Sequence, residues 1–97
     1  MVNINEFIIS INQDHPPSGL NSLLLALWYD AKGDWEKSHN IAQEIDTKEG
    51  AMIHAYLHRK EGDLWNADYW YRRGGISRKE ISLDEEWKIL VNKFIAE

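Results

Sequence analysis

Hydrophobic residues recur at helical spacing in six stretches of the chain. The clearest stretch carries a single apolar stripe, whose members are Leu83, Trp87, Leu90, Val91, Phe94 and Ile95. Side chains three or four positions apart share one face of an α-helix. The spacing predicts helices over about 4–13, 20–32, 35–45, 48–61 and 83–96, with a fifth in chain order that ends at Arg73. No stretch shows the sustained alternation of a half-buried strand, so the sequence predicts an all-α fold of about six helices.

Turn and cap residues separate these stretches. Gly33-Asp34 and Gly62-Asp63 each pair a residue that tolerates left-handed geometry with a residue that caps the next helix. Three further sites have the spacing of a capping box, and these are Asn3 with Glu6, Asp46 with Glu49, and Ser82 with Glu85. Pro16-Pro17 ends the first helix and Gly74-Gly75 ends the fifth.

The stretch 20–32 is apolar nearly all the way round, which predicts the central helix of the core. Its leucine row is expected to be covered by the first helix through Phe7, Ile8 and Ile11; the row consists of Leu20, Leu23 and Leu27. A row left uncovered would be a dimer contact, so the prediction is a monomer or a homodimer.

The chain of 97 residues predicts one domain with a single core, since 43% of its residues are apolar. We expect an N-terminal helix at 4–13, a first hairpin at 20–45, a second hairpin at 48–73 and a C-terminal capping helix at 83–96. There is no cysteine, which excludes disulfides and thiolate sites. The N-terminal stretch lacks a basic segment, and its apolar run is shorter than the ~20 residues of a membrane span. The expected protein is cytoplasmic, with no membrane contact.

Charge is unevenly distributed along the chain. The net charge of −5 argues against general nucleic-acid binding. Between positions 59 and 79, however, six bases face only three acids. This basic segment is either an ordinary solvated face or an anion-binding surface.

Two segments repeat when Gly33 is laid over Gly62, 29 positions later. Leu25-Ala26, Tyr29, Gly33-Asp34, Trp35 and Ser38 resemble the marks of a tetratricopeptide-type hairpin. In the second copy Ala55, Gly62-Asp63 and Ala67 match, and the stretch 68–72 is similar to the second helix of Sel-type repeats. The resemblance covers about 20–74 and implies two stacked helical hairpins, with the first and last helices capping the ends. The chain is also similar to small bacterial proteins of this helical type, a likeness that implies no activity.

Three histidines form a candidate metal site. His54 and His58 are four positions apart, so both rings lie on one helical face, and His39 on the preceding helix is a possible third ligand. The intervening residues lack the glutamate of a zinc-hydrolase motif. The alternative interpretation is that both rings fill packing positions and hydrogen-bond across the hairpin.

A second candidate is an aromatic and cationic surface on the two helices of the second hairpin. It consists of Tyr56, Arg59, Lys60, Trp65, Tyr69, Arg72 and Arg73. Rigid rings beside guanidinium groups are typical of protein-binding hot spots. Core packing of some of these rings is the alternative interpretation.

The sequence gives little evidence of catalytic motifs, since it has neither a nucleophile elbow nor a phosphate loop. The sequence favours a helical-repeat module that binds a protein partner, with no cofactor. The alternative function is binding of a metal or small ligand by His39, His54 and His58. This alternative includes hydrolytic chemistry at the same site.

Overall fold

Helix-capping side chains divide the chain into the elements that its hydrophobic spacing predicts. The computed structural model describes residues 3–96. Within that range lie six α-helices and no strand: α1 (Ile4–Ser10), α2 (Ser22–Ala31), α3 (Trp35–Gln43), α4 (Lys48–Glu61), α5 (Leu64–Arg73) and α6 (Leu83–Ile95). The prediction of an all-α fold with about six helices is confirmed.

Each helix begins at a polar side chain that accepts a hydrogen bond from a backbone N–H of the first turn. These caps are Asn3, Asn21, Asp34, Thr47, Asp63 and Ser82. The predicted cap at Asp46 was wrong by one position, because Thr47 accepts from the N–H of Gly50. The first helix is shorter than predicted, since hydrogen bonds three residues back tighten the chain from position 11 to 13.

Two left-handed glycines reverse the chain between paired helices. Gly33, with φ of +86°, joins α2 to α3, and Gly62, with φ of +90°, joins α4 to α5. Residues with a side chain rarely adopt this geometry, so both bends depend on glycine.

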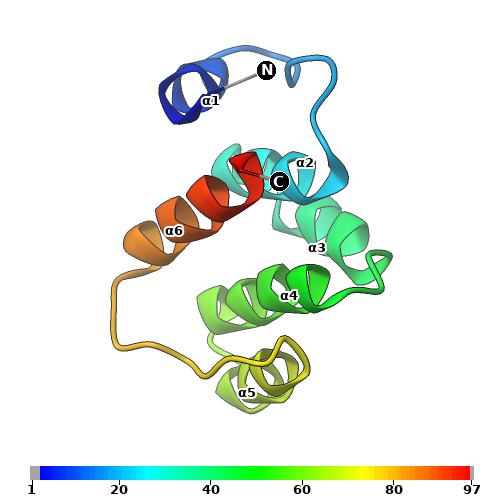
Figure 1. Cartoon of the computed structure of the whole chain (residues 1–97), viewed down its shortest axis with the longest axis vertical. Helices are drawn as coiled ribbons and strands as arrows, with labels where there is room; N and C mark the ends of the chain where they lie inside the picture. Colours follow the sequence, from blue (N-terminus) through cyan, green and yellow to red (C-terminus); the bar gives the residue numbers. More distant parts are fainter. Residues whose placement is uncertain (1–2, 97) are drawn as a thin grey trace.

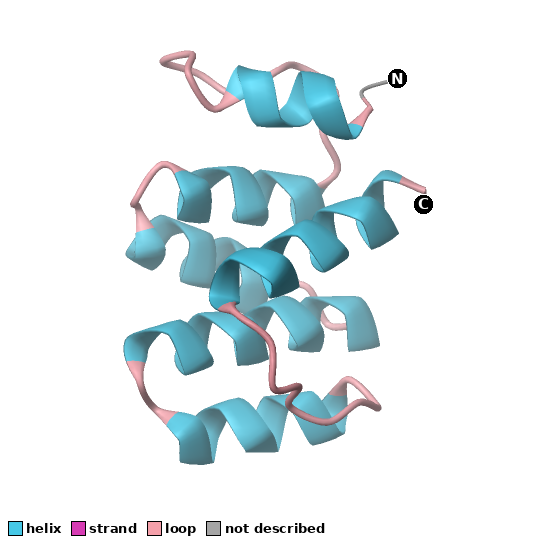
Figure 2. Ribbon diagram, turned by 90° about the vertical axis from the view of Figure 1, so that its left-hand side faces the viewer, coloured by secondary structure: helices cyan, strands magenta, loops and turns pink. Residues whose placement is uncertain are grey.

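The helices form a stack that α6 crosses. Helix α2 packs on α3, α3 packs on α4, and α4 packs on α5 (Figure 1). Helix α6 packs against both α2 and α4, as Figure 2 shows from the side, and α1 contacts α6. The C-terminal helix therefore covers a side of the stack, where the sequence predicted that it would close an end. None of the helices in the described part of the chain is long and apolar enough to span a bilayer.

The main core lies between α1, α2, α4 and α6. Its largest members with almost no exposed surface include Phe7, Trp28, Leu57 and Phe94. The indole N–H of Trp87 donates to the carbonyl of Leu27 at 3.0 Å and ties α6 to α2.

Helix α4 is the most enclosed helix, because every residue from 50 to 57 is buried. This differs from the prediction that 20–32 would be the central helix, since α4 contacts four other helices. The leucine row is covered, since Leu27 is fully buried and Leu20 and Leu23 pack against the core that contains Phe7. The first helix does not cover it in the predicted way, because Ile8 is 39% exposed and α1 packs against α6.

Candidate functional site

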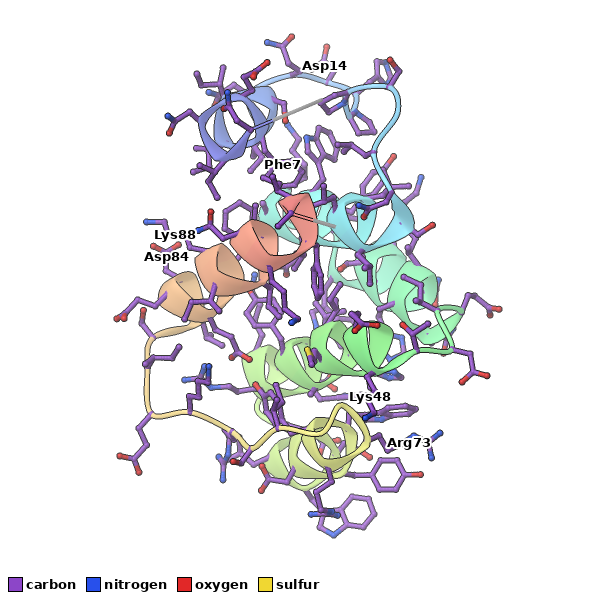
Figure 3. The ribbon with its side chains drawn as sticks, in the orientation of Figure 1. Phe7, Asp14, Lys48, Arg73, Asp84 and Lys88 are labelled. Atoms are coloured by element: carbon purple, nitrogen blue, oxygen red, sulfur yellow. The ribbon has the colours of Figure 1, made fainter. Side chains whose placement is uncertain are left out.

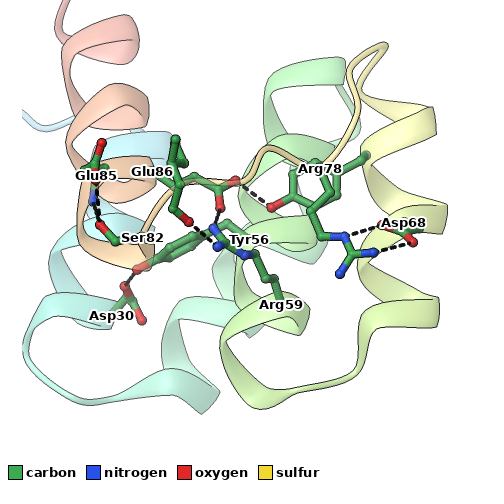
Figure 4. Close-up of polar contacts among 10 residues, drawn as sticks. Asp30, Tyr56, Arg59, Asp68, Arg78, Ser82, Glu85 and Glu86 are labelled. Carbon is green, nitrogen blue, oxygen red and sulfur yellow. Dashed lines mark hydrogen bonds and ion pairs between the residues drawn. The ribbon is translucent and has the colours of Figure 1, made fainter.

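On the side of α4 that faces α2, a buried acid is bound from two directions. Asp30 is 2% exposed, and one of its oxygens accepts from the Tyr56 hydroxyl at 2.9 Å (Figure 4). The other oxygen lies 2.9 Å from Nζ of Lys60. Burial raises the pKa of the Tyr56 hydroxyl, and the neighbouring charge of Asp30 adds to the rise. Tyr56 is therefore a neutral donor that holds α4 to α2.

A second buried acid joins α4, α5 and α6. Glu86 is 7% exposed. One of its carboxylate oxygens accepts a hydrogen bond from the Tyr71 hydroxyl at 2.6 Å, and the other pairs with Nη1 of Arg59 at 2.7 Å. Arg59 also donates to the carbonyl of Ile81. The guanidinium of Arg59, which the sequence assigned to the binding surface, therefore has its partners within the fold.

The predicted aromatic and cationic surface therefore divides into an internal part and an external part. Tyr56 is 2% exposed and does not belong to an accessible surface. Arg59 and Lys60 are each paired with a buried acid. Trp65, Tyr69, Arg72 and Arg73 remain exposed on α5, and we call these four residues the docking face.

Ring stacking orders the docking face. Trp65 is 77% exposed, and its ring lies nearly parallel to that of Tyr69, at a centroid distance of 6.5 Å and an interplanar angle of 12°. The guanidinium carbon of Arg73 lies 5.8 Å from the Tyr69 ring centroid and 5.3 Å from that of Trp70. Nη1 of Arg73 also donates to the Tyr69 hydroxyl at 3.3 Å. Within residues 3–96, Arg72 and Arg73 form no ion pair.

On the side of α4 that faces α3 and α5, the structure brings the three predicted histidines together. Ring centroids are 4.5 Å apart for His39 and His54, 5.2 Å for His39 and His58, and 4.9 Å for His54 and His58. One ring nitrogen of each lies within 4.8 Å of the others. These three residues are the histidine cluster.

The environment disfavours the protonated form of two of these imidazoles, those of His39 and His54. Burial, followed by the charges that His39 and His58 would carry, lowers the pKa of His54 from 6.5 to about 4. Burial and His58 also lower the pKa of His39, against a smaller opposite effect of Glu61. A neutral imidazole retains a lone pair and is the form that binds a metal ion.

Two tryptophans enclose the histidine cluster. The Trp35 ring stacks on His39 at 4.8 Å, and its N–H donates to the carbonyl of Leu57 at 2.9 Å. The Trp70 ring stacks on His54 at 3.9 Å and contacts Tyr69 edge to face. The histidine cluster and the docking face are thus the two ends of one continuous aromatic band across α3, α4 and α5.

A cavity of about 260 Å³ is lined by residues of both the histidine cluster and the docking face. Its lining includes His54, Trp70, Arg73, Lys48 and Asp46. Figure 3 shows Lys48 and Arg73 on the same side of the molecule. His54 is only 6% exposed, and it lines this cavity next to two cationic side chains and one acid.

Sequence reasoning did not find Trp70 as the link between the two candidate sites, nor Asp30 and Glu86 as binding partners. One signal was available for Asp30, which is a lone acid within the apolar stretch 20–32. Such an acid requires a buried cation or donor. No comparable signal marks Glu86, which lies among other acids at the start of α6.

These features define a six-helix all-α protein with an aromatic band that carries a histidine cluster and an arginine-containing face. Comparison of the chain with protein-family models, with curated proteins and with solved structures gave no match.

Proposed function

We propose that this protein is an interaction module whose docking face binds a short acidic segment of another protein. The observation that carries the proposal is the exposed, stacked pair of Trp65 and Tyr69 beside Arg72 and Arg73. Burial of one large apolar side chain is worth roughly 1.5–3 kcal/mol. An indole that is 77% exposed therefore retains most of this free energy for a partner.

The docking face is ordered before it binds. Trp65 stacks on Tyr69, and Tyr69 contacts Arg73 through both its ring and its hydroxyl. Side chains that are already held in one arrangement lose less conformational entropy when a partner arrives. Aromatic rings and arginine are the residue types enriched in the energetically dominant parts of interfaces.

Charge favours an acidic segment as the partner. A guanidinium binds a carboxylate through two parallel hydrogen bonds, and both arginines of the docking face lack an ion pair within residues 3–96. Lys48 lines the adjoining cavity together with Arg73. A short acidic segment contacts only this local cationic region. A long polyanion also approaches the rest of the molecule, whose net charge of −5 repels it.

Selection from a displayed library of random peptides on the immobilised protein tests this proposal. We expect enriched peptides to carry Asp or Glu next to an apolar residue. Their affinity should fall at least about tenfold in Trp65→Ala and in Arg73→Glu, the loss that about 1.4 kcal/mol produces. Lys93→Glu is the matched control, because it makes the same charge change on an exposed position of α6.

Two outcomes would overturn the proposal. One is a set of peptides whose affinity is the same for wild type, Trp65→Ala and Arg73→Glu. The other is equal or tighter binding of a single-stranded oligonucleotide, which would assign the docking face to base stacking. Circular dichroism of each variant establishes that its helices are intact.

A further inference from the structure

We infer that the histidine cluster is a binding site for one divalent first-row transition-metal ion of the zinc type, held by His39, His54 and His58. The inference is independent of the docking face, because its ligands lie on α3 and α4. Three imidazoles converge from two neighbouring helices, and a nitrogen of each lies within 4.8 Å of the others.

The separation of these nitrogens is close to that of a formed site. Zinc–nitrogen bonds of about 2.0–2.1 Å in a tetrahedron place two ligand nitrogens about 3.3 Å apart. The ring nitrogens lie within 4.8 Å of one another, so ion binding would draw them together through rotation of the imidazole rings. His54 and His58 are on one helix at the spacing that aligns their side chains, so only His39 must adjust across a helix boundary.

A carboxylate is positioned to orient one of the ligands. Oε2 of Glu61 lies 2.6 Å from Nδ1 of His58. Metal-binding histidines commonly use one ring nitrogen for the ion, while the other donates to a carboxylate that fixes the tautomer and the ring orientation. Glu61 is therefore a positioning residue, which leaves Nε2 of His58 for the ion.

The other two imidazoles have no polar side-chain partner among the described residues. Within residues 3–96, neither His39 nor His54 makes a side-chain hydrogen bond, and both are held by ring stacking on Trp35 and Trp70. No fully buried side-chain nitrogen in the described part of the chain lacks a hydrogen-bond partner, so the free ring nitrogens of His39 and His54 reach solvent. A metal ion would use the lone pairs that packing alone leaves without a partner.

A cavity adjoins the histidine cluster, and of the three histidines His54 alone lines it. It has a volume of about 260 Å³, and Lys48 and Arg73 are also among its lining residues. A water molecule in the fourth position completes a tetrahedron around three imidazole ligands. Imidazole ligands favour zinc, copper, nickel and cobalt over magnesium and calcium, which prefer oxygen.

Titration of metal-free protein with Zn²⁺, against a chromophoric chelator as competitor, tests the site. We expect one equivalent to bind wild type and His15→Gln, since His15 lies outside the cluster on the chain between α1 and α2. The affinity should fall about 100-fold or more in His39→Gln and in His58→Gln. It should fall about tenfold in Glu61→Gln, the lower end of the range for an orienting carboxylate. Mg²⁺ should not compete.

Substitution of His39 distinguishes the three-histidine site from a second possible metal site that shares His58. His58 also lies within 4.8 Å of Glu61 and Asp63, which form a second group of possible ligands. Zinc binding that survives in His39→Gln and is lost in Asp63→Asn would assign the ion to that group and overturn the three-histidine site. Absence of stoichiometric binding to wild type would also overturn it. Circular dichroism shows whether each variant retains its helices, and both His39 and His58 are partly exposed positions that tolerate polar replacement.

Discussion

The two sides of α4 satisfy their polar groups in different ways. Toward α2 and α6, Asp30 and Glu86 are buried, and each is bound by a cation and a tyrosine hydroxyl. Toward α3 and α5, imidazole and indole rings stack on one another, and most of their nitrogens have no partner among the described residues. The first side holds helices together through internal partners. The second side leaves donor and acceptor capacity for a ligand.

This difference shows that composition alone does not identify a binding surface. Tyr56 and Arg59 have the same chemistry as Tyr69 and Arg73, yet the first two bind acids inside the fold and the last two face solvent. What separates the pairs is the presence of a buried carboxylate within reach. A cation beside such an acid is part of the architecture, and a cation without one is available to a partner.

The largest expected effect is the removal of a buried acid. Glu86→Ala should lower the free energy of unfolding by about 3–5 kcal/mol, because it leaves Arg59 largely buried without its partner. Urea unfolding measures the loss. Asp84→Ala is the matched control on the same helix, and its exposed pair with Lys88 at 3.3 Å is worth less than about 1 kcal/mol. Equal losses in the two variants would contradict the structural role of Glu86.

Acid should weaken the other side of α4. The pKa of His54 is lowered from 6.5 to about 4 in the folded protein, so the unfolded chain takes up this proton first as the pH falls. The stability is complete above about pH 6.5 and is lost as the pH falls toward 4. Each pKa unit corresponds to about 1.4 kcal/mol, which gives a loss of about 3 kcal/mol.

Metal-free protein in chelator provides the measurement for His54, by urea unfolding across this pH range. His54→Phe should flatten the profile while keeping a ring against Trp70, and His15→Gln should leave it unchanged. The groups that face or line the site on its neighbouring elements are His39, His58, Arg73, Lys48 and Asp46. A profile with the same slope in His54→Phe would assign the acid sensitivity to other groups.

An intermediate effect is expected where α4 begins. Gly50 lies so close to the preceding chain that an added Cβ would be 2.2 Å from the carbonyl oxygen of Ile45. Alanine normally stabilises a helix interior by about 1 kcal/mol relative to glycine. Here we expect Gly50→Ala to destabilise by about 2 kcal/mol, since overpacking forces the backbone to shift. A rise in melting temperature would contradict this close approach of the α3–α4 connection.

The smallest effect is expected at the docking face. Trp65→Ala should change the free energy of unfolding by less than about 0.5 kcal/mol, because the ring is exposed. Trp87→Ala, at a position that is 7% exposed, should lose about 3–5 kcal/mol. Thermal or urea unfolding of the two variants distinguishes a tryptophan available for binding from one that supports the core. A loss of several kcal/mol in Trp65→Ala would contradict its assignment to the surface.

Local signals in the sequence were sufficient for the helices, because caps and turns depend on neighbouring residues. Asp34, Asp63 and Ser82 cap helices at the positions that their spacing predicted, and Gly33 and Gly62 form the expected bends. The convergence of His54 and His58 also followed from their spacing, since they are four positions apart on α4.

Contacts between distant segments could not be predicted in the same way. Arg59 meets Glu86 across 27 positions, and Lys60 meets Asp30 across 30 positions. The path of α6 determines the first of these pairs, and helical spacing contains no information about that path. The sequence therefore marked residues whose chemistry is suited to binding, but it did not separate those that already have partners within the fold.

The crossing of α6 over both hairpins has a consequence for how the protein folds. Contacts within each hairpin join residues close in sequence, whereas the bond from Trp87 to Leu27 joins residues 60 positions apart. Closing a long loop costs entropy before its contacts form, so we expect docking of α6 to be the late, rate-limiting event. In a linear solenoid each unit touches only its neighbours, and units can be added or removed one at a time. Here one helix packs against both hairpins, so we expect the hairpins to unfold together in a single cooperative transition.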